Sequence, residues 1–98
     1  MIDFSRIEGF DWDDGNSRKS LAKHGVDQTE AEQVFFNDPL LAVQDAEHSV
    51  LEARLHALGR TDAGRLLHIT FTLRDAGRLI RVISARTMRN ERERTETL

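Results

Sequence analysis

Apolar and polar residues alternate through much of the second half of the chain, and this pattern predicts a β-sheet. In residues 50–58 one face of the expected strand is apolar: Leu51, Ala53, Leu55 and Ala57. The other face of that strand is polar: Glu52, Arg54 and His56. Residues 65–74 alternate in the same way, and shorter apolar segments at 40–43 and 79–85 add two strands. The short connections between the four segments favour an antiparallel meander.

The first half of the chain favours helices. One helix is expected from about Ser17 to Lys23, with Asp14 or Asn16 as its N-cap. Gly25 would end this helix, because glycine adopts the left-handed conformation that follows many helices.

A second helix is expected to begin after Asp27 or Thr29 and to stop before Pro39, since the residue before a proline avoids the helical region. Residues 10–12 have the alternation of a short edge strand. The predicted fold is therefore α+β: an N-terminal short strand and two short helices packed on an antiparallel four-stranded meander, with a short C-terminal helix. Both helices would cover one sheet face and leave the other open.

Length and composition restrict the class of protein. Ninety-eight residues predict a single domain over 1–98, of which 89–98 are polar enough to fray. The absence of cysteine excludes disulfides and thiolate metal sites. No apolar run approaches the ~20 residues that span a bilayer, and Met1–Phe4 lacks the features of a signal peptide. A cytoplasmic protein without membrane contact is expected.

Charge is divided unevenly along the chain. Residues 1–52 carry twelve acidic and four basic residues, a net charge of −8, whereas residues 53–98 carry five acidic and ten basic residues, a net charge of +5. All ten bases of the second half are arginines. Because guanidinium groups bind phosphate in bidentate geometry, this half favours a phosphate-bearing partner such as RNA. A surface of ordinary ion pairs is the alternative interpretation.

The open sheet face would gather the groups that cleave RNA without a metal, namely a base for the 2′-hydroxyl, an acid for the leaving oxygen, and cations for the phosphate. Its candidate proton carriers and cations are Glu52, His56, Arg54, Arg81 and Arg86. A regular strand would point Arg81 and Arg86, five residues apart, to opposite faces. Either a bulge near Ser84 or a strand end before Arg86 would be needed to unite them. His68 is also expected on this face. The structural alternatives are a plain surface ion pair of Glu52 with Arg54 and partly exposed strand histidines at His56 and His68.

Two further features concern single residues. Lys23 and His24 close the first expected helix, where the helix dipole favours positive charge, although an ordinary C-cap would have the same composition. His48 and Glu52 offer only two metal ligands, so neither a metal nor any other cofactor is expected.

Several motifs together resemble one family. The first half contains Phe10-x-Trp12-Asp13, Lys23-His24-Gly25-Val26 and Asp38-Pro39-Leu40. The second half contains Glu52-x-Arg54, Gly59-Arg60, Gly64-Arg65-Leu66-Leu67 and Ile80-Arg81-Val82-Ile83-Ser84-Ala85-Arg86. In order and spacing these motifs resemble the BrnT toxin family over about residues 10–90.

The resemblance implies a ribonuclease toxin of a type II toxin–antitoxin system, with a fold similar to the RelE ribonucleases. Such a toxin would inhibit translation by degrading RNA, and a BrnA-like antitoxin with a ribbon-helix-helix domain would neutralise it. Operator DNA would be bound only through that antitoxin, within a complex that represses its own promoter.

The resemblance also supplies site residues. The catalytic candidates are Lys23, His24, Glu52, Arg54, Arg81 and Arg86. The RNA-binding candidates are Arg60, Arg65, His56 and Arg89. Two departures from the family pattern are Ser20, where asparagine is common, and a tail without the usual tyrosine, since the chain has none. The tail is therefore not assigned a catalytic role.

Two other classes of function compete with the nuclease. A catalytically inactive subunit that binds its antitoxin and acts with it as an autorepressor fits the same motifs. A protein that reads a DNA groove fits less well, because the first expected helix is short and the second is acidic.

Overall fold

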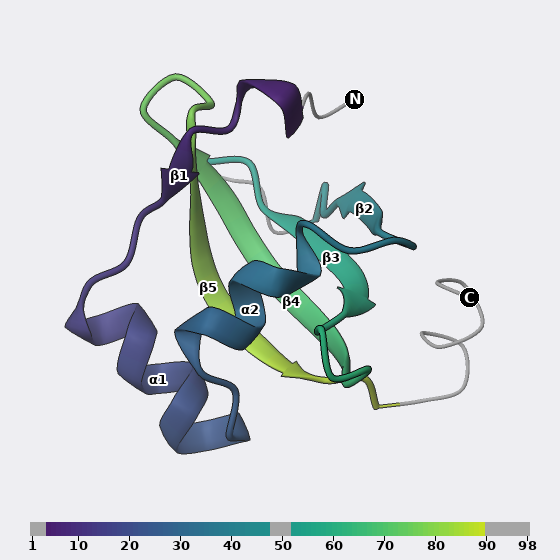
Figure 1. Cartoon of the computed structure of the whole chain (residues 1–98). Coiled ribbons are helices and arrows are strands. Elements are labelled where there is room, and N and C mark those ends of the chain that lie inside the picture. Colours follow the sequence, from purple (N-terminus) through teal and green to yellow (C-terminus); the bar gives the residue numbers. More distant parts are fainter. Residues whose placement is uncertain (1–3, 48–51, 90–98) are drawn as a thin grey trace.

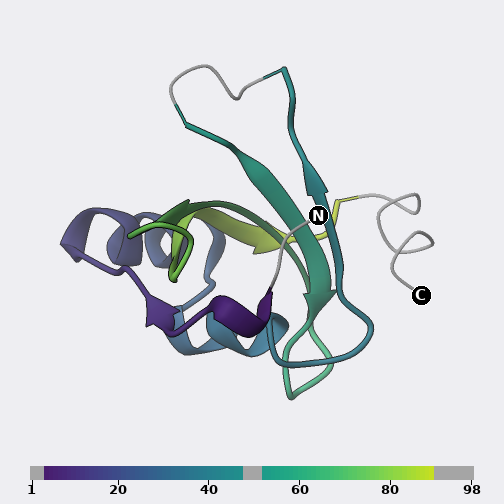
Figure 2. The same cartoon turned by 90° about the horizontal axis from the view of Figure 1, so that it is seen from above.

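Five strands form one sheet, and both helices lie on the same side of it (Figures 1 and 2). The structure is a computed structural model that describes residues 4–47 and 52–89. Its elements in chain order are η1 (Phe4–Arg6), β1 (Gly9–Phe10), α1 (Asp14–His24), α2 (Gln28–Val34), β2 (Leu41–Gln44), β3 (Leu55–Arg60), β4 (Leu66–Arg74) and β5 (Leu79–Thr87). The predicted α+β class is confirmed, and the expected C-terminal helix lies outside the described residues.

The strand order is β1-β5-β4-β3-β2. Strands β2 to β5 form the predicted antiparallel meander, and β1 adds a parallel fifth strand beside β5. The second predicted strand begins at Leu55, later than expected, and Ala53 is exposed although the alternation placed it inside. At this point the Thr72 hydroxyl donates a hydrogen bond to the Ala53 carbonyl at 2.5 Å. A side chain therefore bonds the backbone where a strand ladder was expected.

Both helices begin with a capping box. Asp13, and neither Asp14 nor Asn16, is the N-cap of α1, because Asn16 occupies the third helical position and its side chain accepts a hydrogen bond from the Asp13 amide. Asp27, one of the two starts expected from the sequence, caps α2, with Glu30 as its reciprocal partner. Gly25 ends α1 with φ of 66°, which confirms the predicted left-handed residue.

Helix α1 covers an edge of β5 that β1 leaves unpaired. The pairing of β1 with β5 reaches only to Ile80. Beyond it, the Asn16 side chain donates to the Val82 carbonyl at 2.9 Å, and the Ala85 amide donates to the Ser20 hydroxyl at 2.9 Å. Asn16 and Ser20 are one helical turn apart, so a single face of α1 satisfies backbone groups of this strand.

The core lies between the helices and the sheet. Its buried members are Val26, Ala31, Val34, Leu55, Ala57, Leu67, Ile69, Phe71, Ile80, Val82 and Ala85. Gly59 permits the close approach of α2 to β3, since a Cβ atom at this position would lie 2.8 Å from Val34 Cγ1. In the described part of the chain, no helix is long and apolar enough to cross a membrane.

Candidate functional site

The sheet face away from the helices, called the polar face below, carries most of the predicted chemistry. It comprises side chains from three neighbouring strands: His56, His68, Thr70, Arg81 and Arg86. Their strand neighbours on the opposite face form the core. Alternation therefore directs these polar side chains away from α1 and α2.

A β-bulge brings the two arginines of β5 to this face. A register shift opposite Thr70 and Phe71 leaves Ile83 as an extra residue in β5. Of the two conditions considered for uniting the arginines, the bulge near Ser84 is the one present, and Arg81 and Arg86 share a face although they are five residues apart. Their Cα atoms lie roughly 15 Å apart along the strand, so they would meet different phosphates of a nucleic acid.

Four side chains form a continuous chain of hydrogen bonds across the polar face. Arg86 Nη2 lies 2.8 Å from His68 Nδ1, and His68 Nε2 lies 2.9 Å from His56 Nδ1. His56 Nε2 in turn lies 2.8 Å from Asp45 Oδ2. The Thr70 hydroxyl is 3.1 Å from His56 Nδ1. The chain crosses from β5 through β4 and β3 to the residue that follows β2.

The residues at the two ends of this chain, Arg86 and Asp45, determine which nitrogen donates each hydrogen bond. A guanidinium only donates, so His68 Nδ1 must accept and His68 Nε2 must carry the ring proton. His56 Nδ1 then accepts from His68, and His56 Nε2–H donates to the Asp45 carboxylate. Both imidazoles are therefore neutral Nε2–H tautomers in this arrangement. The side chains of His56 and Asp45 are 26% and 15% exposed, so solvent reaches the chain only in part.

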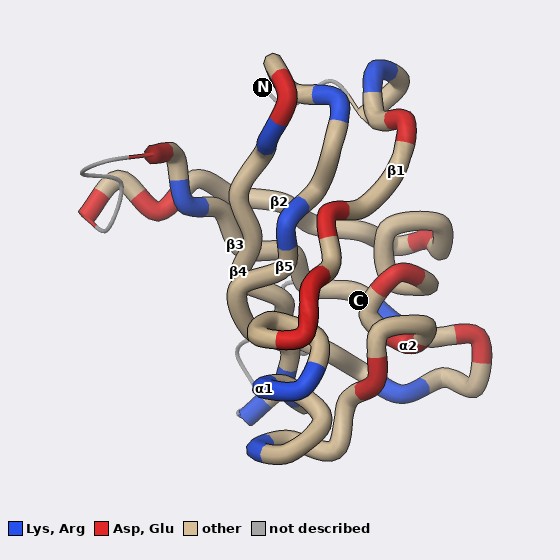
Figure 3. The backbone as a smooth tube through the Cα atoms, turned by 90° about the vertical axis from the view of Figure 1, so that its left-hand side faces the viewer, with Lys and Arg blue, Asp and Glu red and all other residues tan. Residues whose placement is uncertain are grey.

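Arg81 is bound by two acidic residues of the segment between β1 and α1. Its guanidinium lies 2.9 Å from Asp13 Oδ2 and 3.5 Å from Asp11 Oδ1. Figure 3 shows acidic positions of this segment beside the basic positions of β5. The backbone amide of Asn16 and the Arg81 guanidinium lower the pKa of the Asp13 carboxyl below its usual value. Part of the Arg81 charge is therefore balanced within the molecule.

Glu52 and Arg54 lie at one margin of the polar face. Glu52 Oε1 accepts a hydrogen bond of 3.2 Å from Arg74, at the end of β4. Arg54 is half-buried and lies directly before β3, two residues from His56. The structure therefore pairs Glu52 with Arg74, whereas the sequence had suggested Arg54 as its partner.

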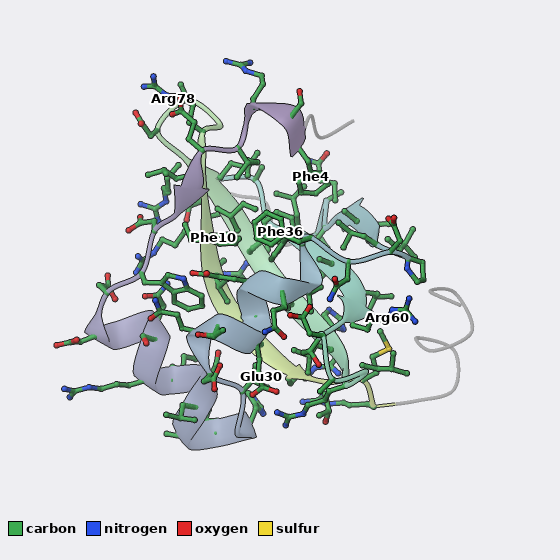
Figure 4. All side chains as sticks on the ribbon, in the orientation of Figure 1. Phe4, Phe10, Glu30, Phe36, Arg60 and Arg78 are labelled. Atoms are coloured by element: carbon green, nitrogen blue, oxygen red, sulfur yellow. The ribbon has the colours of Figure 1, made fainter. Side chains whose placement is uncertain are left out.

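Lys23 and His24 belong to a different region. They end α1, where the Arg65 guanidinium donates to the carbonyls of Gly25 and His24 at 2.9 and 3.4 Å and forms an ion pair with Glu30 at 3.0 Å. Arg65 thus joins the end of α1 to the start of α2, where Glu30 lies (labelled in Figure 4).

The six catalytic candidates do not form one cluster. Arg65, beside His24, precedes β4, whereas Arg74, beside Glu52, ends it. A strand of this length separates the two positions by about 30 Å. Arg60 and Arg89, predicted to bind RNA, are exposed, and Figure 4 shows Arg60 at the far end of β3. The polar face therefore unites Arg81 and Arg86 with the imidazoles and leaves the end of α1 separate.

The position of His68 on the open face was predicted from the sequence, but its bond to His56 and the part of Asp45 in the network were not. Asp45 follows β2 and its role depends on the pairing of β2 with β3, while His68 faces His56 diagonally across β3 and β4. The detectable signal was the polar position of His68 in the alternation of β4. Among the residues described, no three His, Cys, Asp or Glu side chains are arranged to hold a metal ion.

Ion pairs within the molecule neutralise part of the positive charge of the second half. Four arginines of the second half form ion pairs with acidic residues of the first half: Arg65 with Glu30, Arg74 with Glu52, Arg78 with Glu8, and Arg81 with Asp11 and Asp13. Such partly exposed pairs contribute little stability each, but they reduce the positive charge that the surface presents.

The fold and the family agree with a toxin nuclease. The structure is similar to the crystal structure of the Brucella abortus ribonuclease toxin, BrnT, with a TM-score of 0.62 and 20% sequence identity, over 84% of this chain and 97% of that chain. The sequence model of the family described as "Ribonuclease toxin, BrnT, of type II toxin-antitoxin system" matches residues 12–92. The chain therefore belongs to the BrnT ribonuclease toxin family. Comparison with curated proteins gave no match.

Proposed function

We propose that the chain is an endoribonuclease that cleaves RNA by metal-independent acid–base chemistry on the polar face. The observation that carries this proposal is the β5 bulge, because it unites Arg81 and Arg86 with two imidazoles on one face. Imidazole is the common proton carrier of enzymes near neutral pH, and guanidinium groups stabilise the charge that develops on phosphate. The family to which the chain belongs supports the same activity.

The positions of the arginines suggest how an RNA strand would lie. Arg86, which contacts His68, would bind the phosphate that is cleaved. Arg81 would bind a neighbouring phosphate along β5, and Arg54 would bind the strand at the margin near Glu52. Lys23 and His24 would meet RNA away from the cleaved bond, while Arg65 has a structural role between α1 and α2.

A turnover assay tests this function. The purified chain is incubated with single-stranded RNA in excess EDTA, and product length is compared with electrophoretic mobility. Shortened RNA in EDTA is expected, and substitution of a 2′-deoxy nucleotide at the cleaved position should prevent cutting there. Arg18→Gln is a matched control, because Arg18 is an exposed α1 arginine whose ion pair is with Asp14. Loss of cleavage in EDTA with recovery in Mg²⁺ would contradict the metal-independent mechanism.

In the cell, such an enzyme would act in the cytoplasm and inhibit translation by degrading RNA. A BrnA-like antitoxin with a ribbon-helix-helix domain would neutralise it and would carry the complex to operator DNA. If the antitoxin covers the arginines of the polar face, electrostatic steering should make association rates fall steeply as salt increases. A salt-independent rate would favour a different surface.

The alternative contact surface for the antitoxin contains Phe36. Its side chain is 77% exposed, and its ring centroid lies 6.1 Å from that of Phe10 (Figure 4). An exposed aromatic side chain of this kind is a typical interface anchor. Phe36→Ser should leave antitoxin affinity unchanged if the polar face is the contact, and should weaken it at least tenfold if Phe36 is the anchor.

A second candidate function is an inactive subunit that binds the antitoxin and acts with it as an autorepressor. The observation that favours it is the number of arginines already bound by acidic side chains, Arg81 included. The turnover assay separates the two functions, since an inactive subunit would alter the mobility of its partners without shortening RNA.

A further inference from the structure

The hydrogen-bond chain from Arg86 to Asp45 has a direction, and that direction matters for catalysis. Each member donates to the next: Arg86 to His68, His68 to His56, and His56 to Asp45. One carboxylate thus fixes the tautomers of two consecutive imidazoles. The nitrogen at the Arg86 end, His68 Nδ1, is the one whose lone pair faces the charged guanidinium group.

We propose that His68 is the general base of RNA cleavage and that substrate binding uncovers it. This inference rests on the proposed ribonuclease function. A phosphate attracts Arg86 more strongly than a neutral imidazole does, because the phosphate bond is charge-assisted and bidentate. When Arg86 moves to the phosphate, His68 Nδ1 loses its donor and lies next to the bound nucleotide. The base therefore becomes available only when the phosphate is in place.

The proton transfer can be followed atom by atom. The 2′-hydroxyl gives its proton to His68 Nδ1 while the 2′-oxygen forms a bond to phosphorus. The bond from phosphorus to the 5′-oxygen breaks, and that oxygen takes a proton from water. The products are a 2′,3′-cyclic phosphate and a 5′-hydroxyl. His68 then returns its proton to solvent, and Arg86 can bond His68 Nδ1 again.

His56 and Asp45 are positioning residues in this scheme. Protonated His68 donates through Nε2 to His56 Nδ1, and His56 donates to the Asp45 carboxylate, so the negative charge stabilises the imidazolium through one intervening ring. The orienting carboxylate of a catalytic triad acts in the same way on a single histidine. Thr70, 3.1 Å from His56 Nδ1, holds the middle ring from the side.

The charged and titratable groups that the structure brings to the two rings come from each strand packed against them. Among the contacts described for these rings, they are Asp45 after β2, the imidazoles themselves on β3 and β4, and Arg86 on β5. A pH profile of the reaction would therefore report on this network. The wild-type rate should rise with pH as His68 becomes the free base and should then level off.

The test is single-turnover cleavage of an RNA oligonucleotide by the full chain across a pH series. His68→Ala should lower the plateau rate by about 10²- to 10⁴-fold, the usual contribution of a general base, and should remove the rising limb. His68→Gln keeps a polar side chain of similar length but cannot take the proton, so it should show the same loss of rate and of the rising limb. This variant controls for a folding defect in His68→Ala. Asp45→Asn should keep a rising limb but shift it to lower pH.

Two results would distinguish failure of the proposed ribonuclease function from failure of the His68 assignment alone. Wild-type chain that leaves RNA at full length overturns the proposed function and this inference with it. An active wild-type chain whose His68→Gln variant cleaves within about threefold of its rate, with the same pH profile, overturns only the assignment of His68. A ¹H–¹⁵N spectrum of the ring nitrogens gives an independent check: two Nε2–H tautomers are expected, and an Nδ1–H tautomer at His68 would contradict the directed chain.

Discussion

Replacing Asn16 with alanine should destabilise the protein more than its short side chain suggests. Asn16 is 6% exposed, and its amide makes three hydrogen bonds to backbone groups. It accepts from the Asp13 amide at 2.7 Å and donates to the carbonyls of Asp11 and Val82 at 3.1 and 2.9 Å. These bonds connect the start of α1 to the edge of β5, where Arg81 lies.

The magnitude follows from those three bonds. A hydrogen bond contributes about 1 kcal/mol net, and a buried carbonyl left without a donor costs more. Asn16→Ala should therefore lower the free energy of unfolding by about 3 kcal/mol. A domain of this size has roughly 5–15 kcal/mol in total, so the loss is large. Asn16→Asp should cost at least as much, because it sets a carboxylate oxygen against two carbonyl oxygens.

Urea unfolding followed by the fluorescence of Trp12, the only tryptophan, measures this change directly. Ser17→Ala is a suitable control on the same helix, because its hydroxyl bonds Gln28 in an exposed position, and it should change stability by less than about 0.5 kcal/mol. If Asn16→Ala costs under about 1 kcal/mol, the bonds to β5 do not hold α1 in place and this reasoning is refuted.

Other variants test separate parts of the structure. Gly59→Ala should cost about 1–3 kcal/mol in urea unfolding, because the new methyl group would overlap the valine of α2. Ala76→Gly should raise stability by about 1 kcal/mol, since Ala76 has φ of 55° in the turn before β5. The lowered pKa of Asp13 stabilises the fold above the unfolded value near 4, and this stability is lost as pH falls through the lower folded pKa. Asp13→Asn should remove that dependence in unfolding curves at pH 6 and pH 3. Arg81→Gln should slow RNA cleavage on the order of 10²-fold, and it is a cleaner test than Arg81→Glu, which would add a carboxylate beside two others.

The sequence predicted the elements well because local patterns determine them. Alternation located β4 and β5, and the glycine at position 25 ended α1 as expected. The bulge at Ile83 was inferred only as a condition for uniting two arginines, since nothing in the local sequence requires it. The N-cap of α1 is Asp13, one residue before the nearest predicted candidate, because several neighbouring polar residues can act as N-caps.

The candidate site was less predictable because it depends on contacts between distant strands. The bond between His56 and His68 requires the register of β3 against β4, and the bond to Asp45 requires that of β2 against β3. A one-residue slip would move either imidazole to the core face. The acidic partners of Arg65 and Arg81 could not be predicted for the same reason, since they lie more than 30 residues away in the chain.

The roles proposed for Arg86 and His68 can be tested by a crystal structure of the protein with an RNA oligonucleotide that carries a 2′-deoxy nucleotide at the cleaved position. The uncleaved phosphate is expected on the polar face, within hydrogen-bond distance of Arg86, with His68 Nδ1 facing the position of the missing 2′-oxygen. A phosphate bound beside Lys23 and His24, with Arg86 still bonded to His68, would contradict both roles.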